Sequence, residues 1–206
     1  MQAITDLIMY FHKGGLVMWP LLACSITVIA IAIERFIYYK SVDSGAAFAV
    51  RYCTAVRSGD FAVATELARR GNGQCAQMLA DVAAIAGGKE EKSAFLESRA
   101  GIFMATLRDK LDYLGIVVTM APLLGLLGTI VGMIGAFSIF NVEAGAPIAI
   151  TGGIGEALIA TATGLCVAIL SLCAHSYFAH RMDNMITDME QCFSALLEAE
   201  TRRARS

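Results

Sequence analysis

The sequence predicts an all-α integral membrane protein with three transmembrane helices, the second and third of which extend into a cytoplasmic helical bundle. Hydrophobic residues make up 57% of the 206 residues, more than in a typical soluble domain. Three apolar runs, at 15–33, 114–140 and 148–178, are each long enough to cross a hydrocarbon core about 30 Å thick. No lysine or arginine occurs between Lys110 and Arg181, so this part of the chain does not form an ordinary water-exposed surface.

The first two elements are expected to be a periplasmic amphipathic helix at residues 1–14 and a transmembrane helix at residues 15–39. Apolar side chains recur at helical spacing in the first, which suits a helix lying in the membrane interface. The second could be mistaken for a signal peptide because it lies near the N-terminus. Its apolar run is too long, however, and Glu34-Arg35-Phe36 follows where a cleavage site needs small residues. We therefore interpret it as a retained helix.

Residues 40–112 are expected to form a cytoplasmic helical segment, because they are rich in alanine and hold ten of the sixteen basic residues. Three glycine-containing breaks divide this segment into four helical pieces: 58–60, 71–73 and 87–88. Asp60 is placed to cap the piece that begins at Phe61. No breaker separates the last piece from the second span, so one continuous helix is expected to leave the membrane here.

The remaining elements are expected to be two further spans, a short loop and a tail: transmembrane helix 113–140, periplasmic loop 141–147, transmembrane helix 148–178 and cytoplasmic helix 179–206. Basic residues are frequent in the middle segment and the tail and absent from the loop. By the positive-inside rule, the N-terminus and the loop face the periplasm and the C-terminus faces the cytoplasm. Apolar residues of the tail recur at helical spacing and are expected to pack against the middle segment and neighbouring subunits: Met182, Met185, Ile186, Met189, Phe193 and Leu196.

Cysteine, histidine and net charge give no sign of a metal site, a cofactor or a nucleic-acid partner. The six cysteines form no CxxC pair, and the three histidines form no i, i+4 pair. We expect the cysteines to be small buried hydrophobic side chains in a reducing or lipid environment. The net charge of −2 is spread thinly along the chain. No cofactor, no metal and no enzymatic activity are therefore expected.

A row of small residues, which we call the glycine seam, marks the second span: Ala121, Gly125, Gly128, Gly132 and Gly135. Steps of 4, 3, 4 and 3 residues place them on one helix face. In lipid, small residues favour helix association because they let two backbones approach closely. The third span offers Gly153, Ala157 and Gly164 in return. The seam indicates packing either between copies of a homo-oligomer or between the second and third spans of one chain.

Glu156 is the only acidic or basic residue within the body of the second and third spans. A charge at this depth costs at least about 2.5 to 3.5 kcal/mol, so a functional role is favoured over a structural one. Thr163 shares the stripe of Glu156, among small residues that could line a pathway. Thr129 lies about a quarter-turn from the glycine seam. A lone threonine in a helix commonly bonds a preceding carbonyl, so spacing alone favours a structural role for Thr129.

Three stretches together resemble the MotA/TolQ/ExbB proton-channel family, above all its ExbB and TolQ branches: "GGLVMWPLLACSITVIAIAIER", "LDYLGIVVTMAPLLGLLGTIVGMIGAF" and "GGIGEALIATATGL". The resemblance covers nearly the whole chain. The second and third stretches are specific to the family, whereas the first is weaker alone. The chain departs from the family pattern at Thr151-Gly152-Gly153 and Leu170-Ser171, where prolines are expected.

The resemblance implies a three-span subunit that assembles as a homopentamer in the bacterial inner membrane, around a single-span partner of the ExbD or TolR type. Protons would cross at an aspartate of that partner, surrounded by pore residues that correspond here to Thr129, Glu156 and Thr161. Glu156 and Thr161 are five residues apart, about 140° around a helix, so Thr163 is a further candidate. The implied function is a stator that uses the proton-motive force to energise TonB-dependent transport.

Four alternatives remain open from the sequence. A TolQ-type subunit of the Tol-Pal system would act on a TolA-like instead of a TonB-like protein, and a non-conducting membrane scaffold would pass no protons. An intramembrane protease could use Ser171 and His175, which are i, i+4 and within reach of each other, but no oxyanion context accompanies them. The flagellar-stator branch resembles a four-span design and is disfavoured by the three spans found here.

Overall fold

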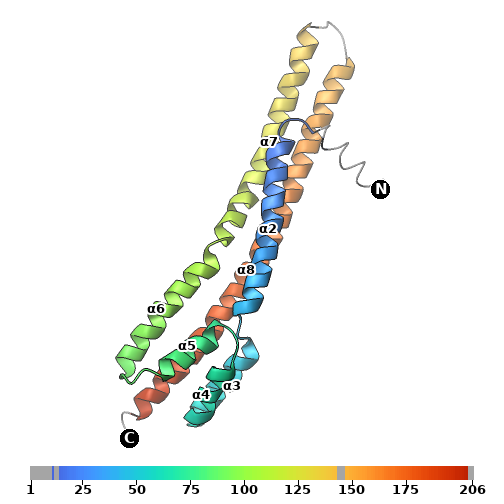
Figure 1. Cartoon of the computed structure of the whole chain (residues 1–206). Helices are drawn as coiled ribbons and strands as arrows, with labels where there is room; N and C mark the ends of the chain where they lie inside the picture. Colours follow the sequence, from blue (N-terminus) through green and yellow to red (C-terminus); the bar gives the residue numbers. More distant parts are fainter. Residues whose placement is uncertain (1–10, 12–13, 143–146, 204–206) are drawn as a thin grey trace. The chain divides into compact units, whose positions relative to one another are not determined.

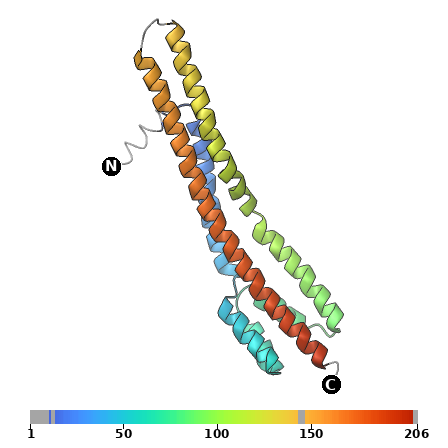
Figure 2. The same cartoon turned by 180° about the vertical axis from the view of Figure 1, so that it is seen from behind.

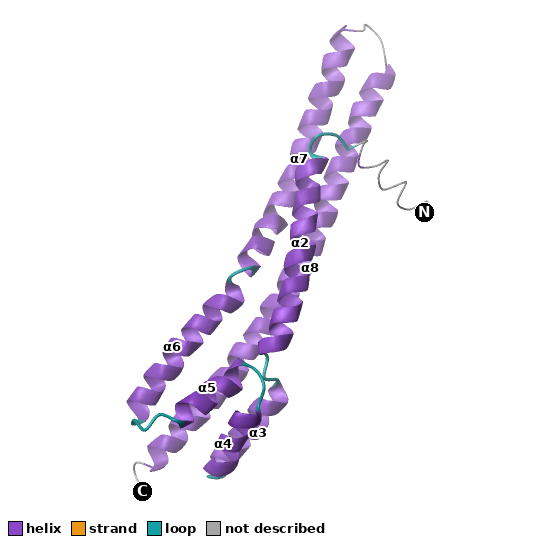
Figure 3. Ribbon diagram, in the orientation of Figure 1, coloured by secondary structure: helices purple, strands orange, loops and turns teal. Residues whose placement is uncertain are grey.

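The computed structural model describes residue 11 and residues 14–142 and 147–203 (Figure 1). Every regular element in these residues is a helix, as Figure 3 shows, so the predicted all-α class is confirmed. In chain order the helices are α2 (Met18–Val42), α3 (Ala46–Arg57), α4 (Phe61–Arg70), α5 (Gln74–Ala83), α6 (Lys89–Arg108), α7 (Leu111–Val142) and α8 (Pro147–Arg203).

Three of these helices, α2, α7 and α8, contain stretches long and apolar enough to cross a membrane, which agrees with the predicted number of spans. Helix α8 is 57 residues long and includes both the third span and the helix expected after it. The expected interfacial helix at 1–14 lies almost wholly outside the described residues. The centre of the expected loop, 143–146, lies outside them too.

The chain divides into two compact units, and α2 and α8 contribute to both. The membrane unit consists of Met1–Ile33 and Asp112–Ser176. The bundle unit consists of Glu34–Leu111 and Tyr177–Ser206. The first corresponds to most of the predicted apolar spans and the second to the predicted charged segments.

In the membrane unit, α2, α7 and α8 run side by side, as both main views show (Figures 1 and 2). Leu21 and Leu114 between them are 0% exposed. Large apolar side chains also cover the outer faces, where Leu123, Ile134 and Leu158 are each more than 60% exposed. A helix that is apolar on every side suits a lipid environment, because its outward face has no need of polar groups.

The bundle unit contains the four short helices that the breaks predicted, α3 to α6. Gly59 and Gly73 adopt φ values of +81° and +91°, which favour glycine because it lacks a Cβ atom. Asp60 caps α4 as predicted, since its Oδ1 accepts the backbone N–H of Val63 at 3.1 Å. The glycine breaks and the aspartate cap therefore set these helix ends locally.

The tail of α8 supplies a row of buried side chains to the core of the bundle unit. Met182, Met185, Met189, Phe193 and Leu196 are at most 9% exposed, and Ile186 is half-buried. Met185 and Met189 line one small cavity together with Cys75 of α5 and Phe103 of α6. The predicted packing of the tail against the middle segment is confirmed, whereas its packing against neighbouring subunits stays a prediction.

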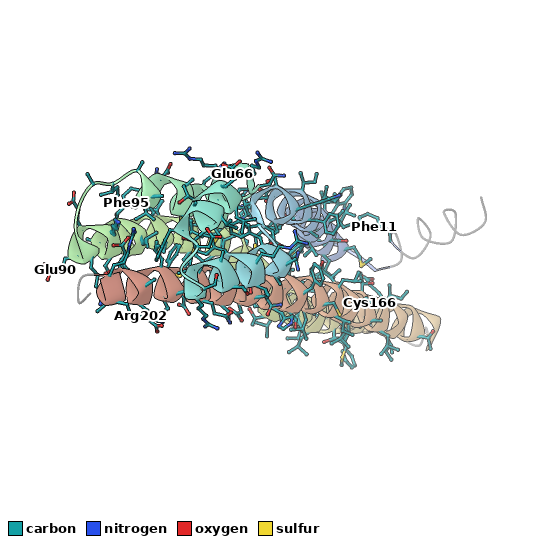
Figure 4. All side chains as sticks on the ribbon, turned by 90° about the horizontal axis from the view of Figure 1, so that it is seen from below. Phe11, Glu66, Glu90, Phe95, Cys166 and Arg202 are labelled. Atoms are coloured by element: carbon teal, nitrogen blue, oxygen red, sulfur yellow. The ribbon has the colours of Figure 1, made fainter. Side chains whose placement is uncertain are left out.

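The cysteines differ between the two units. In the bundle unit Cys53, Cys75 and Cys192 are buried, and the Sγ atoms of Cys53 and Cys192 lie 3.9 Å apart. Burial raises the pKa of the Cys53 thiol to about 11, which keeps it protonated and unreactive. Cys166 is exposed on α8 (Figure 4), and Cys173 on the same helix is exposed too, so neither is buried within the protein as expected. Both lie on an apolar span, where lipid replaces protein as their surroundings.

The second span does not continue into α6 as one unbroken helix, because residues 109–110 separate α6 from α7. Arg35, which is 3% exposed, donates from Nη1 to the carbonyl oxygen of Thr106 at 3.0 Å. The hydroxyl of Tyr39 donates to the carbonyl oxygen of Leu107 at 2.9 Å. In a continuous helix these carbonyls would accept N–H groups four residues on. The expectation of one long helix is wrong because side chains of α2 bind these carbonyls.

Candidate functional site

Small residues let α7 and α8 approach within backbone contact. A Cβ atom built on Gly132 would lie 3.0 Å from the carbonyl oxygen of Gly153 and 3.3 Å from the Cβ of Ala157. One built on Gly164 would lie 3.0 Å from the Cα of Gly125. The same Cβ on Gly164 would lie 2.6 Å from the backbone oxygen of Ala121, so a side chain there would force the two backbones apart. A side chain at Gly132 would need its neighbours to shift by a few tenths of an ångström.

The glycine seam is used largely within one chain. At Gly128 the Cβ of Ala160 fills the space that a side chain would need. Gly135 differs, since no described atom lies within 4 Å of a Cβ built there. Of the two arrangements that the seam allowed, the structure therefore has the contact between the second and third spans. The seam by itself no longer indicates a homo-oligomer, and a packing role for Gly135 stays a prediction.

Thr161 lies in this contact between α7 and α8. Its hydroxyl donates to the backbone carbonyl of Gly125 at 3.0 Å, across 36 residues of sequence. The carbonyl is accessible because Gly125 has no side chain to cover it. Thr161 therefore links the second span to the third in one chain.

The other two candidate threonines bond to their own helices. The hydroxyl of Thr129 donates to the carbonyl of Leu126 at 2.6 Å, and that of Thr163 donates to the carbonyl of Ile159 at 2.8 Å. Both side chains are half-buried. All three hydroxyls therefore donate to backbone carbonyls and none to the carboxyl group of Glu156.

Glu156 lies against the start of α2, a neighbour that sequence periodicity gave no means of finding. A Cβ atom built on Gly15 would lie 2.7 Å from the Cδ and 3.3 Å from the Cγ of Glu156. The carboxyl group thus occupies the volume that a side chain at position 15 would fill. Glu156 is half-buried in this position.

Ser171 is hydrogen-bonded to the backbone and not to His175. Ser171 is 0% exposed, and its hydroxyl donates to the backbone carbonyl of Leu114 at 2.9 Å. Its hydrogen therefore links α8 to α7 and is not directed at an imidazole. In the part of the chain that the structure describes, no group of three or more metal-binding side chains is arranged to hold an ion.

Comparison with known proteins gives a consistent assignment. The sequence model of the MotA/TolQ/ExbB proton channel family matches residues 72–191, more than half of the chain. The biopolymer transport protein ExbB-like 1 of Synechocystis sp. is 34% identical over 168 residues, which cover 79% of this chain and 66% of that protein, just under two thirds of it. ExbB-like 3 of the same organism is 30% identical over 164 residues, which cover 77% of this chain and 78% of that protein.

A relative from another branch is also similar. The Tol-Pal system protein TolQ of Pseudomonas aeruginosa is 36% identical over 81 residues, which cover 39% of this chain and 35% of that protein. The match to the family model and the breadth of similarity to ExbB-like proteins agree with the three apolar helices of the fold. This multi-pass membrane protein therefore belongs to the MotA/TolQ/ExbB proton channel family, with its greatest similarity to the ExbB branch.

Proposed function

We propose that this chain is the proton-channel stator subunit of an ExbB-ExbD type motor in the bacterial inner membrane. Several copies, expected to be five, would surround a single-span ExbD-like partner. Proton flow would then drive a TonB-like protein that energises transport across the outer membrane. The observation that carries the proposal is Glu156, an acid within an apolar span of a chain that belongs to a proton-channel family.

The position of Glu156 supports a role in conduction. An acid inside a membrane span is costly, so such residues commonly mark ion or proton pathways. Its carboxyl group contacts glycine at the start of α2 and is half-buried, so it is partly accessible. A carboxyl group that can reach a water-filled space between subunits can set the electric field of a proton path.

The threonines supply hydroxyl groups of the kind that a carboxylate of the partner would bind. The Thr129 hydroxyl donates to a carbonyl of its own helix, and a hydroxyl rotates readily to a new acceptor. In the proposed cycle the ionised partner carboxylate accepts a hydrogen bond from Thr129. Protonation then removes its charge and weakens this bond, so that the partner helix is free to move.

The energy available is sufficient for such a cycle. Each proton that crosses a potential of 100 mV supplies about 2.3 kcal/mol. A hydrogen bond to a charged group contributes about 1.5 to 3 kcal/mol in proteins. One or two protons can therefore supply the energy needed to break a contact between the partner and one subunit.

The proposed orientation follows from charge. The N-terminus and the loop at 141–147 would face the periplasm, and the bundle unit with its ten basic residues between Lys40 and Lys110 would lie in the cytoplasm. The interfacial helix at 1–14 and the boundaries of the three spans given above belong to the same proposal.

The test is proton flux in liposomes that hold the chain together with its single-span partner under an imposed potential. Glu156→Gln and Thr129→Val are expected to assemble normally and to lower flux by at least about tenfold, equivalent to about 1.4 kcal/mol in the barrier. Glu90→Gln is the matched control, because Glu90 is exposed in the bundle unit (Figure 4). Wild-type flux in both variants would contradict the site. No flux from the unmodified complex would favour a non-conducting scaffold.

A TolQ-type subunit is the second candidate, supported by the similarity to TolQ of Pseudomonas aeruginosa. The two functions share the proton path and differ in the partner. Purification of the tagged chain from its native membrane, with mass spectrometry of the single-span protein that accompanies it, distinguishes them. A TolR-like partner and a TolA-like client would favour the second function.

A further inference from the structure

Gly15, just before α2, has a backbone conformation that disfavours a side chain, and the carboxyl group of Glu156 fills the space where its Cβ atom would lie. Gly15 has a φ of +71°, in the left-handed region that L-residues rarely adopt. An added Cβ atom would overlap the Oε1 of Glu156 and would lie 2.7 Å from its Cδ. Glycine at position 15 and the position of the Glu156 carboxyl group therefore depend on each other, although 141 residues separate them in the sequence.

The surrounding contacts hold this arrangement in place. A Cβ built on Gly14 would lie 3.2 Å from the Cγ2 of Ile159, one turn along α8 from Glu156. The Cβ of Val17 lies 3.7 Å from a Cβ built on Gly128 of α7. Val17 is 6% exposed in this packing. The first turn of α2 is thus packed against both other helices of the membrane unit at the level of the carboxyl group.

Backbone hydrogen bonds define the turn that carries Gly15. They run from the N–H of Met18 to the carbonyl of Gly15 at 3.2 Å and from the N–H of Trp19 to the carbonyl of Leu16 at 3.3 Å. This turn leads directly into α2, which begins at Met18. The backbone of Gly15 is therefore held beside the Glu156 carboxyl group by the turn that starts the first span.

We propose that Gly15 is a positioning residue for Glu156, and that the start of α2 fixes the carboxyl group of the third span where conduction needs it. The inference rests on the proposed function, because it concerns the same proton path. It gives the first span a part in that path. The candidate residues Thr129, Glu156, Thr161 and Thr163 all lie on the second and third spans.

The first experiment measures proton flux through the complete complex with its single-span partner. Gly15→Ala is expected to lower flux by at least about tenfold, because the carboxyl group must move by an ångström or more. Glu156→Asp shortens the side chain by one methylene group, about 1.5 Å. The double variant Gly15→Ala/Glu156→Asp is therefore expected to conduct as well as Glu156→Asp alone. No such rescue would overturn the inference.

Two controls separate this effect from backbone strain. Gly45 has a similar φ of +80°, but no described atom lies within 4 Å of a Cβ built there. Gly45→Ala introduces the same backbone strain but no overlap with another side chain. Because Gly45 lies outside the membrane unit, this variant is expected to keep proton flux within about twofold of wild type. If Gly15→Ala conducts normally while Glu156→Gln does not, the inference fails and the proposed function stands. If Glu156→Gln conducts normally, the proposed function itself fails.

A stability cycle keeps the inference testable if Gly15→Ala does not assemble. The midpoint of thermal unfolding is measured for Gly15→Ala in two backgrounds, wild type and Glu156→Ala. The downward shift is expected to be large with Glu156 present. In the Glu156→Ala background, Gly15→Ala should lower the midpoint only as much as Gly45→Ala does, because only backbone strain remains. Equal shifts in the two backgrounds would mean that Gly15 acts independently of Glu156, which overturns the inference.

Discussion

The helices within each unit pack by different means: small residues allow close contact in the membrane unit, and large side chains fill the core of the bundle unit. In the membrane unit, α7 and α8 approach closely where side chains are absent, as at Gly132 and Gly164. In the bundle unit, the core is filled by large side chains such as Leu79 and Met189, each 1% exposed. The difference follows from the solvent: water drives apolar side chains together, whereas lipid does not and leaves close backbone packing as the main source of attraction. Substitutions that reduce or enlarge a side chain should therefore affect the two units differently.

The largest effect is expected from a loss of volume in the bundle unit. Met189→Ala should lower the free energy of unfolding by about 3 kcal/mol, because it removes buried apolar atoms and leaves a cavity. Denaturant titration of the full chain in detergent micelles measures this value. Gln191→Ala, two residues away and exposed, is the control and should change it by less than about 0.5 kcal/mol. An effect below about 1 kcal/mol at Met189 would mean that large side chains do not hold this unit together.

In the membrane unit, a substitution that adds a side chain is expected to lower the free energy of unfolding. Gly164→Val should cost about 2 to 3 kcal/mol, because the new side chain meets the backbone of α7, which cannot rotate away. Gly135→Val is the matched control in α7, since the space beside Gly135 is open in the described residues. The same titration, followed through a probe in the third span, measures both. Equal costs at the two glycines would show that backbone contact is not what joins these helices.

Arg35 is a large buried side chain that also donates hydrogen bonds to the backbone of α6. Its substitution should lower the free energy of unfolding by an intermediate amount. Arg35→Met keeps much of the volume but removes the donor to the Thr106 carbonyl and the ion pair with Glu34, so a cost of about 2 kcal/mol is expected. Hydrogen exchange at residues 106–112 should change most, because this substitution releases the end of α6. Arg57→Met, at an exposed arginine, is the control. Unchanged exchange in this segment would refute the capping role of Arg35.

Local signals predicted much of the fold. Runs of apolar residues predicted three spans, glycine-containing breaks predicted the ends of the short helices, and the position of Asp60 predicted a helix cap. Each of these depends on residues close together in sequence. The break between α6 and α7 could not be predicted in this way, because the side chains that bind the carbonyls at the end of α6, Arg35 and Tyr39, lie about 70 residues away in the sequence.

In the candidate site, too, local sequence features could be predicted and contacts between distant residues could not. Its residue types could be identified because an acid and hydroxyl groups are unusual in apolar spans. Their neighbours could not be identified, since no pattern links Glu156 to Gly15 or Thr161 to the Gly125 carbonyl. Spacing of 4 and 3 residues predicted a contact face on α7 but not whether its partner was another span or another copy.

The smallest effect should come from one hydroxyl group between α7 and α8. Thr161→Val removes the bond to the Gly125 carbonyl and should cost about 0.6 kcal/mol, the average for hydrogen bonds between membrane helices. Thr163→Val removes a bond within α8 and is the control, with almost no cost expected. Unfolding titrations of the two variants side by side measure the difference. A larger cost at Thr163 would contradict the role of Thr161 in the contact.

The size of this effect decides how a functional result at Thr161 is read. Domains are commonly stable by about 5 to 15 kcal/mol, so a loss of about 0.6 kcal/mol leaves nearly every molecule folded. A tenfold fall in proton flux corresponds to about 1.4 kcal/mol in the barrier, more than the contact itself contributes. A fall of that size in Thr161→Val, with assembly intact, exceeds the energy of the lost contact and would support a place for the Thr161 hydroxyl in the proton path. Normal flux would leave it as a link between the two helices.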